Sequence, residues 1–431
     1  MLLSNKEGEP DHTWHGGMMS IRFFFKLLIF SGFWASLTVV GFPLTSVAVA
    51  SRLQASVEMR AIVHFFRGAN FQRDKELNEA IDEYKEALKL DDQFAEAYNN
   101  LGTVYFEKSD YGKATEFYEK ALDLHEDFAA AHSNLGTVYS RQAYRMNVNQ
   151  FYRRAINHLE KAIELDPNLP EAYNTLGVVY HRRGEFHRSS EFFMKAKQVR
   201  PSYVDAYNNL GFTLSRLGQL DRARKELLAA LQIDSHFAPA RHNLGMLDLR
   251  GGDHESALKA LEEAVANSPD FIASYVELAA LHLKQDRDVE ALQVARRAVR
   301  VDPTSAQAQN ILGLSHLRSG DENAALAALE EAVKVDDYFA EGHANLGALL
   351  VLQGDPKRAL TELDRATELD ARLADPYRYR GNIFFRQSES QRSIESFTRY
   401  LELVPDAADA EQVSSLIDLL RAIEGEKDSE N

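Results

Sequence analysis

Small residues recur every 34 residues along this chain, in three separate columns of the repeat. Counted from Ala61, the eighth position is glycine in every period except one, where it is Ala279. The twentieth position is always alanine or serine, and the twenty-seventh is alanine until Tyr400 breaks the series. Side chains must be minimal where two helices cross closely, so this spacing predicts a stacked array of helix pairs.

The composition excludes several classes of function. The 431 residues include 65 Asp and Glu against 49 Lys and Arg, so we expect no sequence-independent binding to nucleic acid or to anionic lipid. There is no cysteine, which rules out disulfides, thiolate metal sites and a cysteine nucleophile. The sequence contains no His-Glu-x-x-His, Gly-x4-Gly-Lys or Gly-x-Ser-x-Gly motif. We therefore predict a protein that is not an enzyme and that needs no cofactor or metal.

Residues 1–50 have the features of a targeting segment. Leu27 to Ala50 contains no charged residue, two basic residues precede it, and Ala48-Val49-Ala50 is a small-x-small end. This pattern is typical of a signal peptide cleaved before Ser51. The alternative is an uncleaved membrane anchor, because 24 residues can span a bilayer. Translation starting at Met18 or Met19 would give a signal of ordinary length.

Both alternatives predict export. The basic residues would stay in the cytoplasm and the repeats would lie in the periplasm, either free or attached to the inner membrane through residues 27–50. Residues 51–60 then form a lead-in to the first repeat helix.

Each period contains two amphipathic helices. In the fourth, Tyr173, Leu176 and Tyr180 form one apolar stripe, and Gly184 ends that helix. The pattern of aromatic, Leu-Gly, aromatic, Ala, aromatic, Ala and Pro positions resembles the tetratricopeptide repeat. The resemblance covers residues 61–407, about ten repeats, and implies an all-α, right-handed superhelical solenoid.

Two segments depart from the period. The third repeat is seven residues too long, and its extra stretch, residues 142–150, contains neither glycine nor proline. Seven residues are about two helical turns, so we expect longer helices that project from the array. Residues 408–431 contain one apolar stripe, which predicts a helix that caps the last repeat and is followed by an acidic tail. The stripe consists of Val413, Leu416, Ile417, Leu420 and Ile423.

Asparagines occupy the face that lines the concave groove in the family. An asparagine amide both donates and accepts, so it can pair with a peptide unit without reading its side chain. The row resembles the asparagine ladder in the superhelical repeats of O-linked N-acetylglucosamine transferase, and the alternative is a role in packing between helices. The candidate peptide-binding asparagines are Asn100, Asn134, Asn174, Asn209, Asn243, Asn310 and Asn345.

A second column, the thirteenth, is mostly basic. Its candidate binding residues are Arg182, Arg216 and Arg250, which could attract an acidic peptide. The position also falls in the last turn of a helix, where the helix dipole favours a cation. The insertion adds Tyr144, Arg145, Met146 and Phe151, a combination that suits either a partner contact or a solvated helical extension.

The sequence thus predicts a scaffold in the cell envelope that binds peptide segments or partner proteins in a concave groove. One alternative is an assembly factor for an envelope machine, such as a type IV pilus or a secretin. Another is a targeting subunit for a separate enzyme.

Overall fold

The computed structural model describes residues 46–146 and 148–430, without the side chains of residues 46–53, 55, 144–146 and 425–430. Within this part every regular element is an α-helix, as the repeat columns predict. The chain divides into two compact units, Met1–Ser235 (unit 1) and His236–Asn431 (unit 2).

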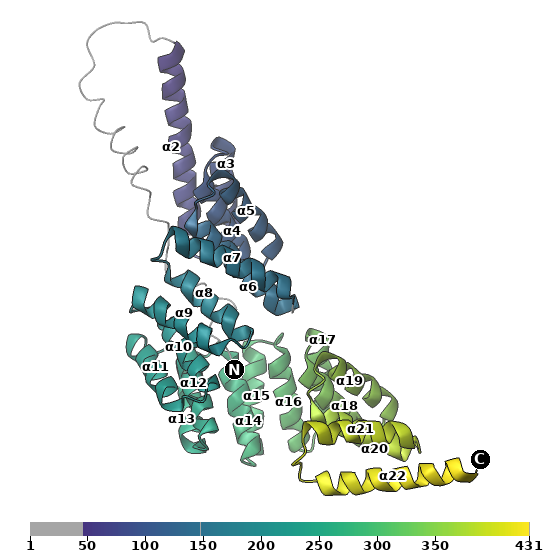
Figure 1. The fold of residues 1–431 in the computed structure, drawn as a ribbon. Coiled ribbons are helices and arrows are strands. Elements are labelled where there is room, and N and C mark those ends of the chain that lie inside the picture. Colours follow the sequence, from purple (N-terminus) through teal and green to yellow (C-terminus); the bar gives the residue numbers. More distant parts are fainter. Residues whose placement is uncertain (1–45, 147, 431) are drawn as a thin grey trace. The chain divides into compact units, whose positions relative to one another are not determined.

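Each unit contributes five helix pairs from its described residues, and Figure 1 shows their order. In unit 1 the pairs are α2 (Ser46–Arg73) with α3 (Leu77–Leu90), α4 (Ala95–Glu107) with α5 (Tyr111–Leu124), α6 (Ala129–Met146) with α7 (Asn149–Leu165), α8 (Pro170–Arg182) with α9 (Phe186–Val199), and α10 (Val204–Arg216) with α11 (Leu220–Ile233). In unit 2 they are α12 (Ala238–Arg250) with α13 (His254–Asn267), α14 (Ile272–Lys284) with α15 (Asp288–Val301), α16 (Ala306–Arg318) with α17 (Glu322–Val335), α18 (Ala340–Leu352) with α19 (Pro356–Leu369), and α20 (Ala374–Arg386) with α21 (Ser390–Leu403). A final helix, α22 (Ala410–Glu430), follows. The prediction of about ten repeats and a C-terminal helix is confirmed.

In nearly every pair, the turn after the first helix contains a residue with positive φ. In the fourth repeat Gly184 has a φ of 79°, and Glu185 N donates to Tyr180 O at 2.9 Å. Glycine adopts this conformation at no steric cost, and five of these turns use it. The third repeat, which carries the insertion, is the exception within the described residues.

The glycine column marks the closest approach of the two helices in a pair. A Cβ added to Gly177 would lie 2.5 Å from Phe193 Cε1, and one added to Gly211 would lie 2.7 Å from Leu227 Cγ. A large side chain of the second helix therefore lies directly on the glycine backbone. The facing residues are Tyr84, Tyr118, Leu159, Phe193, Leu227, Leu261, Leu329, Leu363 and Phe397.

The single exception in this column is compensated. Ala279 replaces glycine in the seventh repeat, and Ala295 stands where the other repeats have tyrosine, phenylalanine or leucine. Both alanines are fully buried. The Cβ of Ala279 is therefore accommodated because the residue opposite is small, which leaves no large side chain to clash with it.

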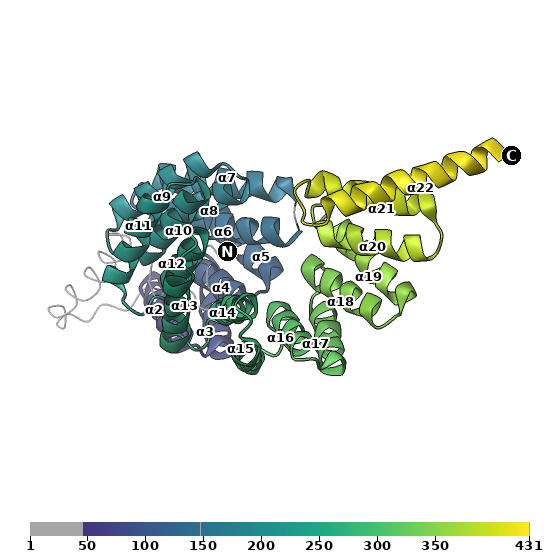
Figure 2. The ribbon, with the colours of Figure 1, turned by 90° about the horizontal axis from the view of Figure 1, so that it is seen from below.

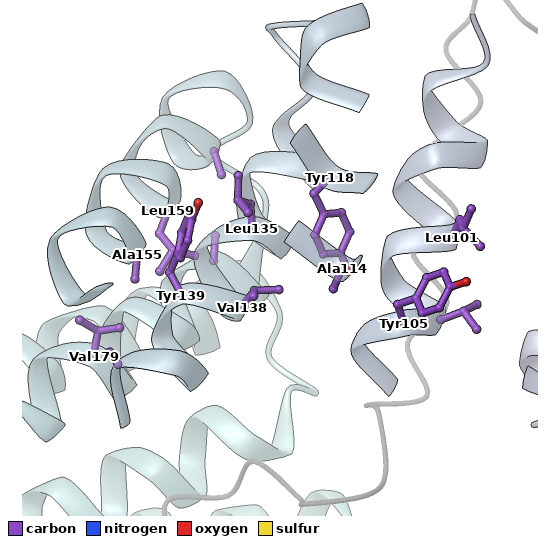
Figure 3. Packing of buried hydrophobic residues seen from close by; sticks show 14 of the residues in the cluster. Leu101, Tyr105, Ala114, Tyr118, Leu135, Val138, Tyr139, Ala155, Leu159 and Val179 are labelled. Carbon is purple, nitrogen blue, oxygen red and sulfur yellow. The ribbon is translucent and has the colours of Figure 1, made fainter. Parts of the chain in front are cut away.

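The alanine columns are buried throughout the array. Every described residue of the twentieth and twenty-seventh columns is fully buried except Tyr400. Where serine replaces alanine its hydroxyl is bonded: Ser189 Oγ donates to Gly177 O at 2.8 Å, and Ser393 Oγ to Gly381 O at 3.0 Å. Figure 3 shows part of the unit 1 core, where Tyr139, Ala155 and Leu159 lie close together.

The third repeat has longer helices, as predicted. Helices α6 and α7 contain 18 and 17 residues, against 13 and 14 in the fourth repeat. The side chains of Tyr144, Arg145 and Met146 lie outside the described residues, so their role in a partner contact stays a prediction. Phe151 is half-buried and stacks on Tyr139 with ring centres 6.1 Å apart.

Both ends of the array differ in part from expectation. Helix α2 already begins at Ser46, so residues 51–60 belong to the first helix instead of leading into it. Helix α22 packs on α21 through Val413, Ile417 and Leu420, which confirms the cap, but Ile423 is 39% exposed. The helix continues to Glu430, where we expected a tail. Figures 1 and 2 show α22 beside α21 in two views.

The predicted targeting segment falls mainly on residues 1–45, which lie outside the described residues. No helix in the described ranges is long and apolar enough to cross a membrane.

Enlarging one glycine should test the close approach of the helices. In Gly211→Ala the new Cβ would press on Leu227 Cγ and on Ala223 O, at 2.7 and 3.1 Å. We expect a loss of about 1–3 kcal/mol in the free energy of unfolding, measured by urea denaturation, because overpacking forces the helices apart. Adding Leu227→Ala should cost less than the sum of the two single changes, since the clash disappears. A purely additive double variant would contradict the explanation.

Candidate functional site

The first helices form the inner face of each unit. Nearly every first helix contacts the first helix of the next repeat in its unit. In unit 1 these contacts are α2 with α4, α4 with α6, α6 with α8, and α8 with α10, and in unit 2 they are α14 with α16, α16 with α18, and α18 with α20. Successive second helices make no comparable contact in the described parts of the chain. The helices that approach one another more closely lie on the inside of a curved stack. The candidate site is therefore this row of first helices.

Three asparagine pairs connect successive first helices. In each pair the sixth-position amide donates to the fifth-position amide of the preceding repeat, 35 residues earlier. The bonds are Asn134 Nδ2 to Asn99 Oδ1 at 2.9 Å, Asn209 Nδ2 to Asn174 Oδ1 at 3.0 Å, and Asn345 Nδ2 to Asn310 Oδ1 at 2.8 Å. A bond of this kind contributes about 1 kcal/mol and fixes the offset between neighbouring repeats.

In repeats 1 to 3 the asparagine pair extends into a continuous chain of hydrogen bonds. The successive donors and acceptors are Asn99 Nδ2 to Asn100 Oδ1 (3.3 Å), Asn100 Nδ2 to Tyr84 Oη (3.3 Å), Tyr84 Oη to Gln72 Oε1 (3.0 Å), and Gln72 Nε2 to Glu107 Oε1 (2.8 Å). Burial raises the pKa of the Tyr84 phenol, which keeps its proton for this bond. The Glu107 side chain is only 7% exposed and has Lys75 Nζ at 3.5 Å. Glu107, the acidic residue in the otherwise basic thirteenth column, is the last acceptor of this series of hydrogen bonds.

The structure places the predicted site residues in two groups. Asn100, Asn134, Asn174, Asn209, Arg182 and Arg216 belong to unit 1, and Asn243, Asn310, Asn345 and Arg250 belong to unit 2. Side-chain hydrogen bonds involve Asn100, Asn134, Asn174, Asn209, Asn310 and Asn345, so part of the capacity that we assigned to a ligand serves the fold. Asn243 is 4% exposed in α12. Contact of any of the ten residues with a ligand stays a prediction.

The arginine column also connects repeats. Arg182 Nη1 donates to Ser140 O of α6 at 3.4 Å. Arg318, in the same column, lies 2.6 Å from Asp286 and 3.3 Å from Asp288 of the preceding repeat. Arg216 and Arg250 are exposed at the ends of α10 and α12, where a cation complements the helix dipole.

Burial and two of these arginines, Arg216 and Arg182, lower the pKa of a histidine, His181. His181 lies against Phe212 of the next repeat, with ring centres 4.8 Å apart, and its Nδ1 is 2.9 Å from Thr213 Oγ1. Burial, and then the charges of Arg216 and Arg182, lower the pKa of His181 to about 4. The imidazole is therefore neutral at pH 7, and this contact between repeats carries no charge of its own.

Sequence reasoning missed the partners of the asparagines. The signal was present, because Asn99 and Asn134, Asn174 and Asn209, and Asn310 and Asn345 all stand 35 residues apart. A 34-residue period with a one-residue offset brings the fifth position of one repeat beside the sixth of the next.

The comparisons with known proteins agree on one family. Models described as TPR repeat or tetratricopeptide repeat match residues 74–109, 95–128, 151–184, 170–203, 202–270, 248–314, 290–343, 310–374 and 345–408. These matches include nearly all of the described helix pairs. The chain belongs to the tetratricopeptide repeat family, and the resemblance seen in its sequence is confirmed. No curated protein matches it in sequence.

Solved structures share the fold at low identity. A chain of the APC/C hetero-tetramer Cut9–Hcn1 is 14% identical, with a TM-score of 0.52, and the match covers 88% of each chain. Yeast Tom70 is 15% identical over 84% of this chain and 96% of its own, with a TM-score of 0.48. YrrB, described as a TPR protein with an unusual peptide-binding site, is 24% identical over 47% of this chain and 97% of its own, with a TM-score of 0.35. The likeness to the Cut9–Hcn1 chain supports the solenoid fold and, at this identity, nothing finer.

The asparagine pairs should couple neighbouring repeats energetically. We expect Asn310→Ala and Asn345→Ala each to lower the free energy of unfolding by about 1 kcal/mol, because each change leaves a half-buried amide group without its partner. In the double variant the two losses should not add, and the coupling measured by urea denaturation should be about 0.5–1 kcal/mol. Asn382→Ala, at an exposed position of α20, is the matched control. Additive losses would show that the pair has no structural role.

Proposed function

We propose that this protein is an interaction scaffold whose row of first helices binds an extended segment of a partner protein. The tetratricopeptide family supports the general role of a protein-interaction scaffold. The finer proposal, binding along the asparagine row, rests on the geometry of the asparagine pairs.

The observation that carries the proposal is the spare bonding capacity of these pairs. An asparagine amide has two N–H groups and two acceptor lone pairs, and each pair is joined through one N–H and one oxygen. Asn134, Asn310 and Asn345 are only half-buried, so their remaining groups are accessible to a ligand. Their side chains are already held in place by the pairing, which lowers the entropy cost of binding a peptide backbone.

An Asn310→Asp variant separates binding from folding. A carboxylate at this position still accepts the bond from Asn345 Nδ2, but it removes both N–H groups and adds a negative charge to the inner face. We expect a near wild-type unfolding midpoint and clearly weaker capture of partner proteins, measured by quantitative mass spectrometry of pull-downs from the native extract.

The matched control is Asn323→Asp, which makes the same change at an exposed position of the second helix α17. It should leave capture unchanged. Equal capture by wild type and Asn310→Asp would eliminate the inner-face proposal, and a loss with Asn323→Asp alone would place binding on the second helices.

We also propose that the protein is exported and works in the cell envelope. The support is the apolar run from Leu27 to Ala50, the basic residues before it, and the small residues at its end. Helix α2 continues through the proposed cleavage point between Ala50 and Ser51. An uncleaved anchor would leave that helix intact at the membrane surface.

The mature N-terminus distinguishes these two forms. If the segment is a signal peptide, mass spectrometry of the protein from its native host should find Ser51 as the first residue. If it is an anchor, the protein should remain intact and fractionate with membranes. Full-length protein in the cytoplasmic fraction would contradict export in either form.

A further inference from the structure

One pair of positions joins the first and second helices of a repeat through polar side chains. In the first and ninth repeats it is a histidine with a glutamate: His64 Nδ1 lies 2.6 Å from Glu83 Oε2, and His343 Nδ1 lies 2.6 Å from Glu362 Oε2. In the third repeat both members are histidine, and His132 Nδ1 lies 3.0 Å from His158 Nδ1. Two ring nitrogens therefore face each other where the other two repeats have a histidine nitrogen beside a glutamate oxygen.

The surroundings of His132 fix the position of its proton. Its Nε2 is 3.0 Å from the carbonyl oxygen of Glu126, which can only accept a hydrogen bond. The proton of neutral His132 is therefore on Nε2, and Nδ1 directs a lone pair at His158. A backbone carbonyl that holds the far nitrogen of an imidazole is the arrangement that orients histidine ligands in metal sites.

His158 lies beside an aromatic side chain. Both rings are half-buried, and the ring centre of Tyr139 lies 5.7 Å from that of His158. Imidazole coordinates metals in its neutral form, through a ring nitrogen that carries a lone pair.

We propose that His132 and His158 form a two-imidazole site for a divalent transition-metal ion of the Cu²⁺ or Ni²⁺ type. For both Nδ1 atoms to coordinate the ion, the proton between them moves to Nε2 of His158, so that each ring stays neutral and no proton is released. Imidazole suits these ions, and Cu²⁺ binds most strongly in the first-row series.

The distance between the nitrogens favours this class of ion. With metal–nitrogen distances of roughly 2.0–2.1 Å, nitrogens 3.0 Å apart subtend an angle of about 91–97° at the metal. That angle fits square-planar or octahedral coordination better than the tetrahedral geometry of zinc. Across the described residues no three His, Asp or Glu side chains are grouped as metal ligands, so water would complete the coordination.

The site is tested by isothermal titration calorimetry of the untagged, full-length protein with NiCl₂ and with CuCl₂. We expect one equivalent of binding that is lost in His132→Gln and in His158→Gln. Outer-sphere changes weaken metal sites by about 10–100-fold, so loss of a ligand should weaken this one by at least as much. His343→Gln is the matched control, because it alters the corresponding pair of the ninth repeat and should retain the binding.

Two further measurements keep the test independent of folding. Circular dichroism should show unchanged helix content in both variants, and the metal should raise the melting temperature of the wild type only. Electron paramagnetic resonance of the Cu²⁺ form should show two nitrogen ligands. Binding that persists in both variants, or no binding by the wild type at millimolar metal, would overturn the proposal.

Discussion

The close contact between the glycine column and the large side chain opposite is the constraint on which this array depends. In the fourth and fifth repeats the side chains of Phe193 and Leu227 lie against glycine backbone, at distances that leave no room for a Cβ. Ala279, the one residue of the column with a Cβ, is matched by the small Ala295 in place of a large side chain. A residue with a Cβ thus occurs in this column only opposite a small side chain, and this contact sets the geometry of each pair.

A fixed pair geometry determines which residues of neighbouring repeats meet. Because each repeat adds the same step, the fifth position of one first helix lies beside the sixth position of the next, and asparagines at these positions join. The C-terminal end follows the same logic. Tyr400 replaces the usual alanine, and its hydroxyl donates to Asp409 at 2.6 Å, immediately before the capping helix. A large residue fits there because α22, and not another repeat, follows.

The sequence was sufficient to predict the repeats, the longer helices of the third repeat and the cap, because these depend on periodicity and on residue size. It was not sufficient to predict the partners of the asparagines. An amide offers the same donor and acceptor to a peptide backbone as to another asparagine, so residue type alone does not distinguish the two roles. Only the position of the next helix shows that Asn345 reaches Asn310. Glu107 is a similar case, since its acceptor role depends on Gln72 of the preceding repeat.

The two roles of the asparagines are compatible. A pair that uses one N–H and one lone pair for the fold keeps further donors and acceptors, and the pairing orients them. Backbone recognition of this kind is indifferent to ligand sequence, so selectivity has to come from side chains around the row. The thirteenth column supplies such variation, because it is arginine at Arg216 and Arg250 but leucine at Leu352, which is 67% exposed. A ligand segment beside Arg216 or Arg250 would therefore meet positive charge, whereas a segment beside Leu352 would meet an apolar side chain.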